Sequence, residues 1–77
     1  MILGTIHKIS ERGWATVRPD SGDAANDHYV GRSDWFGSTA WSTGMRVMGD
    51  SDCVGDTLRM RNVKPLAEVP VEVLAEL

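Results

Sequence analysis

Residues 12–20 read RGWATVRPD, and residues 27–33 read DHYVGRS. In an extended chain, alternation of side chains would give each stretch one face with an aromatic ring and an opposite face with small apolar groups. An aromatic ring with basic neighbours on the surface of a sheet is a place where an unpaired base can stack. The two stretches therefore predict neighbouring strands with a shared aromatic and basic face. Its rings are Trp14 and Tyr29, and its basic neighbours are Arg12, Arg18 and Arg32.

Alternation and turn residues predict five strands in all. A chain of 77 residues is one small domain, for which a closed architecture is favoured over an open sheet. Short strands at this spacing are typical of a small barrel, so the expected fold is all-β, with five antiparallel strands in a barrel over residues 1–66 and a tail over residues 67–77. The expected strands are residues 2–9, 13–18, 27–32, 45–51 and 57–63.

The connections between these strands differ in kind. Residues 10–13 predict a tight hairpin turn in which Gly13 supplies a positive φ. Residues 19–26 form a longer polar loop, which resembles part of a calcium-binding loop but lacks the alternating ligands and the terminal Glu. A solvated loop is therefore the preferred interpretation, and no metal or other cofactor is predicted. Residues 52–55 read as a polar turn before the last strand.

Residues 33–44 contain too much Ser, Thr and Gly for a stable helix, although Ser33 is a candidate cap for one short turn. Trp35 and Trp41 are interpreted as buried plugs at the barrel ends, because the chain has few other large side chains to bury. Phe36 should point away from Trp35 and is a candidate for the binding face. Two strand residues, His28 on the third expected strand and Met60 on the fifth, are expected to be buried.

Met60 is predicted in the core, where a long and adaptable side chain can fill space left by small residues opposite. His28 is predicted to face inward beside Tyr29. Arg59 and Arg61 alternate outward on the last strand, and their expected partners are Asp50 or Asp52 on the strand opposite.

The charge is unevenly distributed. The formal net charge is −3, yet residues 1–66 contain all eight basic residues and eight acidic ones, so the deficit comes from Glu68, Glu72 and Glu76 in the tail. A neutral body gains little from counterion release on a polyphosphate. Affinity for nucleic acid must then come from local basic groups and stacking, and it should be modest at physiological salt.

The tail begins with Pro70 at a helix-start position, and the three-residue spacing of Val71, Leu74 and Leu77 predicts a short amphipathic helix. Alternation of Val69, Val71 and Val73 allows a strand instead. Either form leaves an apolar stripe to be covered by the barrel, by a second copy in a homodimer, or by a protein partner. Whether the protein is a monomer or a homodimer is left open.

The N-terminus lacks the pattern of a signal peptide, and no segment approaches the length of a membrane span, so a soluble cytoplasmic protein without membrane partners is expected. The single Cys53 cannot form an internal disulfide. An enzyme is not expected, because the sequence has no recognisable nucleophile and base arrangement and no phosphate-binding Gly loop.

The order of several motifs resembles the cold-shock domain family. The matching residues extend over about 3–66 and include Gly4-Thr5-Ile6, Arg12-Gly13-Trp14, Pro19-Asp20, Asp27-His28-Tyr29-Val30 and the closing Asn62-Val63. The resemblance implies a five-stranded oligonucleotide-binding (OB) barrel that binds single-stranded RNA or DNA, as an RNA chaperone or a transcription regulator.

The chain departs from that family in its aromatic motifs. The family's Lys-Gly-Phe-Gly-Phe-Ile reads RGWATV over residues 12–17, so Thr16 replaces the second aromatic. Its Val-Phe-Val-His-Phe reads HYVGR over residues 28–32, so Arg32 replaces an aromatic. Lys8 stands at the family's exposed Trp, and His7 matches a neighbouring Lys.

Two functional hypotheses follow. The first is binding of single-stranded nucleic acid on a basic and aromatic sheet face, with the preference for RNA or DNA undetermined. The second is a protein-interaction module on the same barrel, such as a regulatory or phage protein that contacts a host protein, with the rings covered or turned toward that partner. The candidate contact residues for the first are Lys8, Arg12, Trp14, Thr16, Arg18, Tyr29, Arg32, His7 and Phe36.

Overall fold

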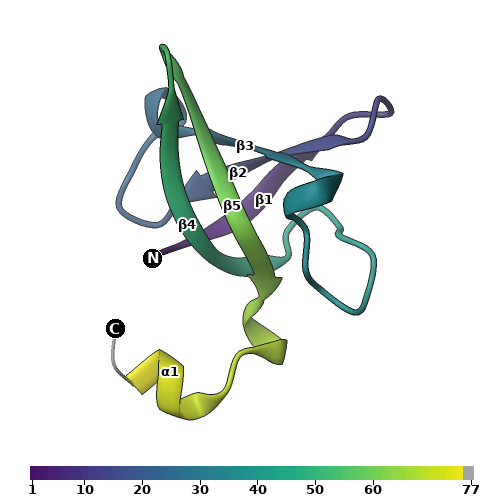
Figure 1. Ribbon diagram of the computed structural model, residues 1–77, viewed down its shortest axis with the longest axis vertical. Coiled ribbons are helices and arrows are strands. Elements are labelled where there is room, and N and C mark those ends of the chain that lie inside the picture. The colour runs from purple at the N-terminus through teal and green to yellow at the C-terminus, as the bar shows by residue number, and fades with distance from the viewer. Residues whose placement is uncertain (76–77) are drawn as a thin grey trace.

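A computed structural model describes residues 1–75 and shows a small barrel with one short helix beside it (Figure 1). Strand order around the barrel is β1-β2-β3-β5-β4, with β4 closing on β1. The prediction of a small, closed, five-stranded OB-like barrel is confirmed. The strands are β1 (Ile2–Ile9), β2 (Trp14–Pro19), β3 (His28–Gly31), β4 (Arg46–Val54) and β5 (Thr57–Pro65).

The expectation of a wholly antiparallel barrel is wrong at one junction. β3 and β5 run parallel, with Tyr29 opposite Arg59, and an isolated parallel bridge joins Trp35 to Val63 farther along. The other pairings are antiparallel. Parallel pairing arises here because residues 32–45 carry the chain from the end of β3 to the start of β4, so that β5 returns beside β3 in the same direction.

The β4–β5 hairpin extends beyond the barrel as an arm (Figure 1). Residues 52–54 belong to β4, so the prediction of a turn there is wrong, and the chain reverses at Gly55 and Asp56 instead. Side chains on this part of the hairpin have no core to face, which removes the alternation of apolar and polar residues that marks a strand in sequence. Cys53 is exposed on the arm.

The core follows the alternation of the strands. Its buried members come from all five strands, and the predicted burial of Met60 and His28 is confirmed. A Cβ atom built on Gly49 would lie 3.0 Å from Met60 Cε and 2.9 Å from the carbonyl oxygen of Arg61. Met60 therefore occupies the space that the absent side chain of Gly49 leaves, as predicted. The buried cluster consists of Ile6, Ala15, Val17, Val30, Val47, Met60 and Val63.

The segment between β3 and β4 closes part of the barrel. It starts with a 3-10 turn over Arg32–Asp34, in which Ser33 does not cap, since the N-cap residue is Gly31 and no side chain bonds there. Trp35 and Trp41 pack against the core but remain half-buried, so their predicted role as plugs holds only in part. Their rings contact each other at 5.8 Å between centroids.

The tail turns away from β2 and β3 (Figure 1). It contains a 3-10 turn over Leu66–Glu68 and the helix α1 (Val71–Ala75), so the helical alternative is the one observed. Val69 is buried, and Glu68 accepts hydrogen bonds from the backbone N–H and hydroxyl of Ser38. The predicted apolar stripe ends at Leu77, which lies outside the described residues. No helix among residues 1–75 is long and apolar enough to cross a lipid bilayer.

Candidate functional site

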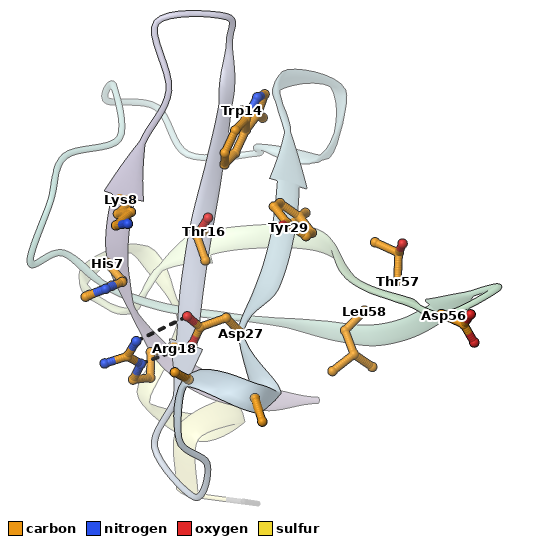
Figure 2. A pocket seen from close by; sticks show the side chains of 12 residues that line it. His7, Lys8, Trp14, Thr16, Arg18, Asp27, Tyr29, Asp56, Thr57 and Leu58 are labelled. Atoms are coloured by element: carbon orange, nitrogen blue, oxygen red, sulfur yellow. Dashed lines mark hydrogen bonds and ion pairs between the residues drawn. The ribbon is translucent and has the colours of Figure 1, made fainter.

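Trp14 and Tyr29 lie next to each other on the outside of the barrel (Figure 2). They are 38% and 46% exposed, whereas their neighbours Ala15 and Val30 face the core. The ring centroids are 5.3 Å apart and the planes meet at 73°, an edge-to-face contact. Because the rings are nearly perpendicular, one base cannot lie flat on both, and each ring offers its own stacking face.

On the other side of Thr16 from Tyr29, a β-bulge in β1 places two polar side chains on the same surface as the rings. Ile6 pairs with Val17 and Lys8 pairs with Thr16, so His7 is the extra residue between them. An extra residue shifts the alternation of a strand by one position. As a result His7 and Lys8 are both exposed, although adjacent residues of a regular strand would point to opposite faces. The sequence carries no clear signal of this bulge.

Thr16 lies between Lys8 and Tyr29, since it pairs with Lys8 on one side and with Tyr29 on the other. The side chain of Thr16 is small and buried, whereas Lys8 and Tyr29 on either side of it are exposed, so the surface is lower at Thr16. The resulting hollow has a volume of about 610 Å³. Of the predicted site residues, six line it together: His7, Lys8, Trp14, Thr16, Arg18 and Tyr29.

Sequence reasoning missed the part of the hollow beyond β3. Thr57 and Leu58 of β5 and Asp56 of the arm line it there, as do Ala24 and Ala25. Ala24 and Ala25 belong to the loop just before β3, whereas residues 56–58 are far from Tyr29 in sequence. Only the parallel pairing of β3 with β5 brings them beside it, so no local pattern could have identified them.

Arg18 is held by a carboxylate within the hollow. Its Nε and Nη2 donate to the two oxygens of Asp27 at 3.0 and 3.2 Å. This hydrogen-bonded pairing lowers the pKa of Asp27 and raises the pKa of Arg18, each against the smaller opposing effect of burial. Asp27 thus stays ionised at neutral pH, and the charge of Arg18 is compensated within the protein.

The other arginines on the strands are also paired. Arg46 bonds Asp20, Arg59 lies 3.6 Å from Asp34, and Arg61 Nε bonds Asp52 at 2.7 Å. The predicted partner of Arg61 is therefore found, while Arg59 pairs elsewhere. Within residues 1–75 no carboxylate lies at ion-pairing distance from Lys8, Arg12, Arg32 or Lys64.

Three predicted site residues lie outside the hollow. Arg12 is exposed in the turn before Trp14. Arg32 lies beside the same turn, where a Cβ atom on Gly13 would be 3.2 Å from its Nε, and its guanidinium carbon is 6.0 Å from the centroid of the Trp41 ring. Phe36 is 54% exposed after the 3-10 turn that follows β3, and it does not line the hollow.

The described tail does not reach this site. None of the tail residues whose side chains the structure describes lines the hollow, and both rings remain accessible. Covering of Trp14 and Tyr29 by this part of the tail is thus ruled out.

Neither a scan against protein-family models nor a search of curated proteins finds a match to this chain.

Proposed function

We propose that the protein binds single-stranded nucleic acid on the hollow between β1 and the β4–β5 arm. The observation that carries the proposal is the exposed pair of Trp14 and Tyr29. Large rings that stay accessible in so small a protein lose apolar burial that folding would otherwise gain. A base stacked on either ring would recover that burial.

The same proposal is supported by the positions of the cations that have no ion-pair partner within residues 1–75. Four arginines are neutralised by aspartates, and three of the remaining four cations belong to strands or turns next to Trp14: Lys8, Arg12 and Arg32. Local positive charge thus exists on a barrel whose overall charge is neutral. We expect phosphates to contact these three cations and bases to stack on Trp14 and Tyr29.

Base stacking explains why the two rings need not be coplanar. Successive bases of a flexible strand can turn relative to one another, and each can take one ring. Stacking tolerates every base and both sugars, so the proposal covers RNA and DNA alike. Membership of the cold-shock family and a cytoplasmic location remain part of the proposal, the latter because the exposed Cys53 is a free thiol.

The proposal is tested with fluorescently labelled single-stranded oligonucleotides and anisotropy titrations. Trp14→Ala and Tyr29→Ala should each weaken binding about 5- to 150-fold, equivalent to about 1–3 kcal/mol per stacked base. Phe36→Ala is the matched control, because it removes a ring of similar exposure outside the hollow and should leave affinity unchanged. Thermal melts show whether each variant remains folded.

Salt dependence provides a second measurement. Contact of Lys8, Arg12 and Arg32 with three phosphates predicts a slope of log affinity against log salt of about −2, since each phosphate contributes about −0.7 for a single strand. A wild-type protein that does not bind at high micromolar oligonucleotide would contradict the proposal. That result would favour the protein-interaction alternative.

A further inference from the structure

We infer, resting on the proposed function, that Arg18 is a positioning residue that neutralises Asp27 inside the hollow and does not itself contact phosphate. Both side chains line the hollow, and Figure 2 shows them below Thr16 and Tyr29. The inference reverses the expectation that Arg18 is one of the phosphate contacts.

The contact geometry directs two of the three guanidinium nitrogens of Arg18 to Asp27. Two of its nitrogens bond the two oxygens of Asp27 in the fork geometry that guanidinium and carboxylate favour. The side chains are 37% and 19% exposed, so Asp27 is the more enclosed partner. Asp23 also acts on Arg18 electrostatically. The charge of this arginine is therefore already matched by carboxylates of the loop before β3.

Without a counterion, Asp27 would be a second carboxylate in the hollow, beside Asp56, which has no ion-pair partner within residues 1–75, and two such charges would oppose binding of a polyphosphate. The hydrogen bond from Arg18 keeps the pKa of Asp27 below its usual value, with smaller contributions from His7 and His28, so its negative charge is permanent near pH 7. Arginine is a permanent cation and supplies a matching permanent charge. With the pair intact, Arg18 and Asp27 add no net charge to the hollow. Of the Lys and Arg side chains without an ion pair within residues 1–75, Lys8 lies in the hollow and Arg12 and Arg32 lie beside it.

A purely structural role is the competing explanation. Asp27 follows the 3-10 turn Ala24–Asn26, and its backbone N–H bonds the carbonyl of Ala24. The pair thus also ties the loop before β3 to β2. An experiment must therefore separate neutralisation from phosphate contact and from support of the fold.

The experiment compares wild type, Arg18→Gln, Asp27→Asn and the double variant by oligonucleotide anisotropy at several salt concentrations. Neutralisation predicts that Arg18→Gln weakens binding about fivefold, the effect of one unscreened charge about 4 Å away in water. The double variant should return to wild-type affinity with an unchanged salt slope, although it lacks the Arg18 charge. Thermal melts of all four proteins establish that binding is measured on folded protein.

Arg61→Gln is the matched control. It leaves Asp52 without its partner on the arm, and neither residue lines the hollow, so binding should be unchanged.

Two results would overturn the inference while leaving the proposed function intact. If Arg18 contacts phosphate, the double variant stays weak and its salt slope falls by about 0.7. If the pair only supports the fold, folded Arg18→Gln binds as wild type does. A wild-type protein that binds no oligonucleotide, with Trp14→Ala indistinguishable from it, instead overturns the proposed function and this inference together.

Discussion

At the scale of single residues, the long side chain of Met60 on β5 packs over Gly49 on β4, which has no side chain. Met60 fills the space over Gly49, and the carbonyl oxygen of Arg61 closes that space from the backbone side. A backbone oxygen cannot move aside as a flexible side chain can. No larger residue fits at position 49, and the space that Gly49 leaves is the space that the Met60 side chain fills.

Met60→Ala should lower the free energy of unfolding by about 2–5 kcal/mol, because it removes buried surface and leaves a cavity that the backbone around Gly49 cannot fill. Chemical denaturation measures the change. Val54→Ala, at an exposed position on the arm, serves as the control and should change stability by less than about 0.5 kcal/mol. A loss at Met60 no larger than the control would show that the core closes over the gap.

At the scale of elements, the strands were predictable and their junctions were less so. Alternation located β1 with the observed bounds and β2, β3 and β5 to within two residues at each end. It failed on the arm, where β4 continues through Val54 without a core to impose a pattern. The bulge at His7 and the parallel pairing of Tyr29 with Arg59 were also hidden, because both depend on how strands meet.

The same limit applies to the candidate site. Trp14 and Tyr29 were identifiable because each alternates with buried neighbours on its own strand. The partner of Arg18 was not, since Asp27 lies nine residues away across a loop. Short-range patterns indicate which way a side chain points, but ion pairing between strands requires the register.

Two hairpin glycines should differ in their tolerance of substitution. Gly13 has φ +94°, and a Cβ atom there would press on Arg32, so Gly13→Ala should destabilise the protein by about 1 kcal/mol or more. Gly55 has φ +62° and open space around it, which is the left-handed conformation that Asn adopts readily. Gly55→Asn should cost less than about 0.5 kcal/mol. Equal losses in urea titrations would contradict this ranking.

At the scale of the whole molecule, ion pairs connect neighbouring strands and loops of the barrel. Asp20 bonds Arg46, Asp27 bonds Arg18, and Asp52 bonds Arg61. In each case the hydrogen bond from the arginine is the main cause of a lowered pKa of the aspartate. The Asp20–Arg46 and Asp52–Arg61 pairs are well exposed and the Asp27–Arg18 pair is partly exposed, so each contributes modestly.

Stability should fall as the pH drops below about 4.5. The aspartates have lower pKa values in the folded state, so the unfolded chain takes up protons first, near its usual pKa of about 3.9. The stabilisation is complete at neutral pH and is lost as pH falls through the folded-state values. Melting temperatures between pH 7 and pH 2 measure it.

The triple variant Asp20→Asn, Asp27→Asn, Asp52→Asn should show a shallower pH dependence and a slightly lower melting temperature at pH 7. Asp56→Asn is the comparison, because Asp56 forms no ion pair within the described part of the chain. If the triple variant and Asp56→Asn follow the same curve, the three pairs do not govern the acid transition.

Tyr29 has two roles in the fold and the site. Its ring lines the hollow, and its backbone pairs with Arg59 where β3 meets β5. If β3 and β5 separate transiently, the Tyr29 ring moves away from Thr57 and Leu58 on β5. A nucleotide that contacts both Tyr29 and β5 would oppose this separation. Occupancy by ligand and resistance of β3 to such breathing are consequently linked, so that each strengthens the other.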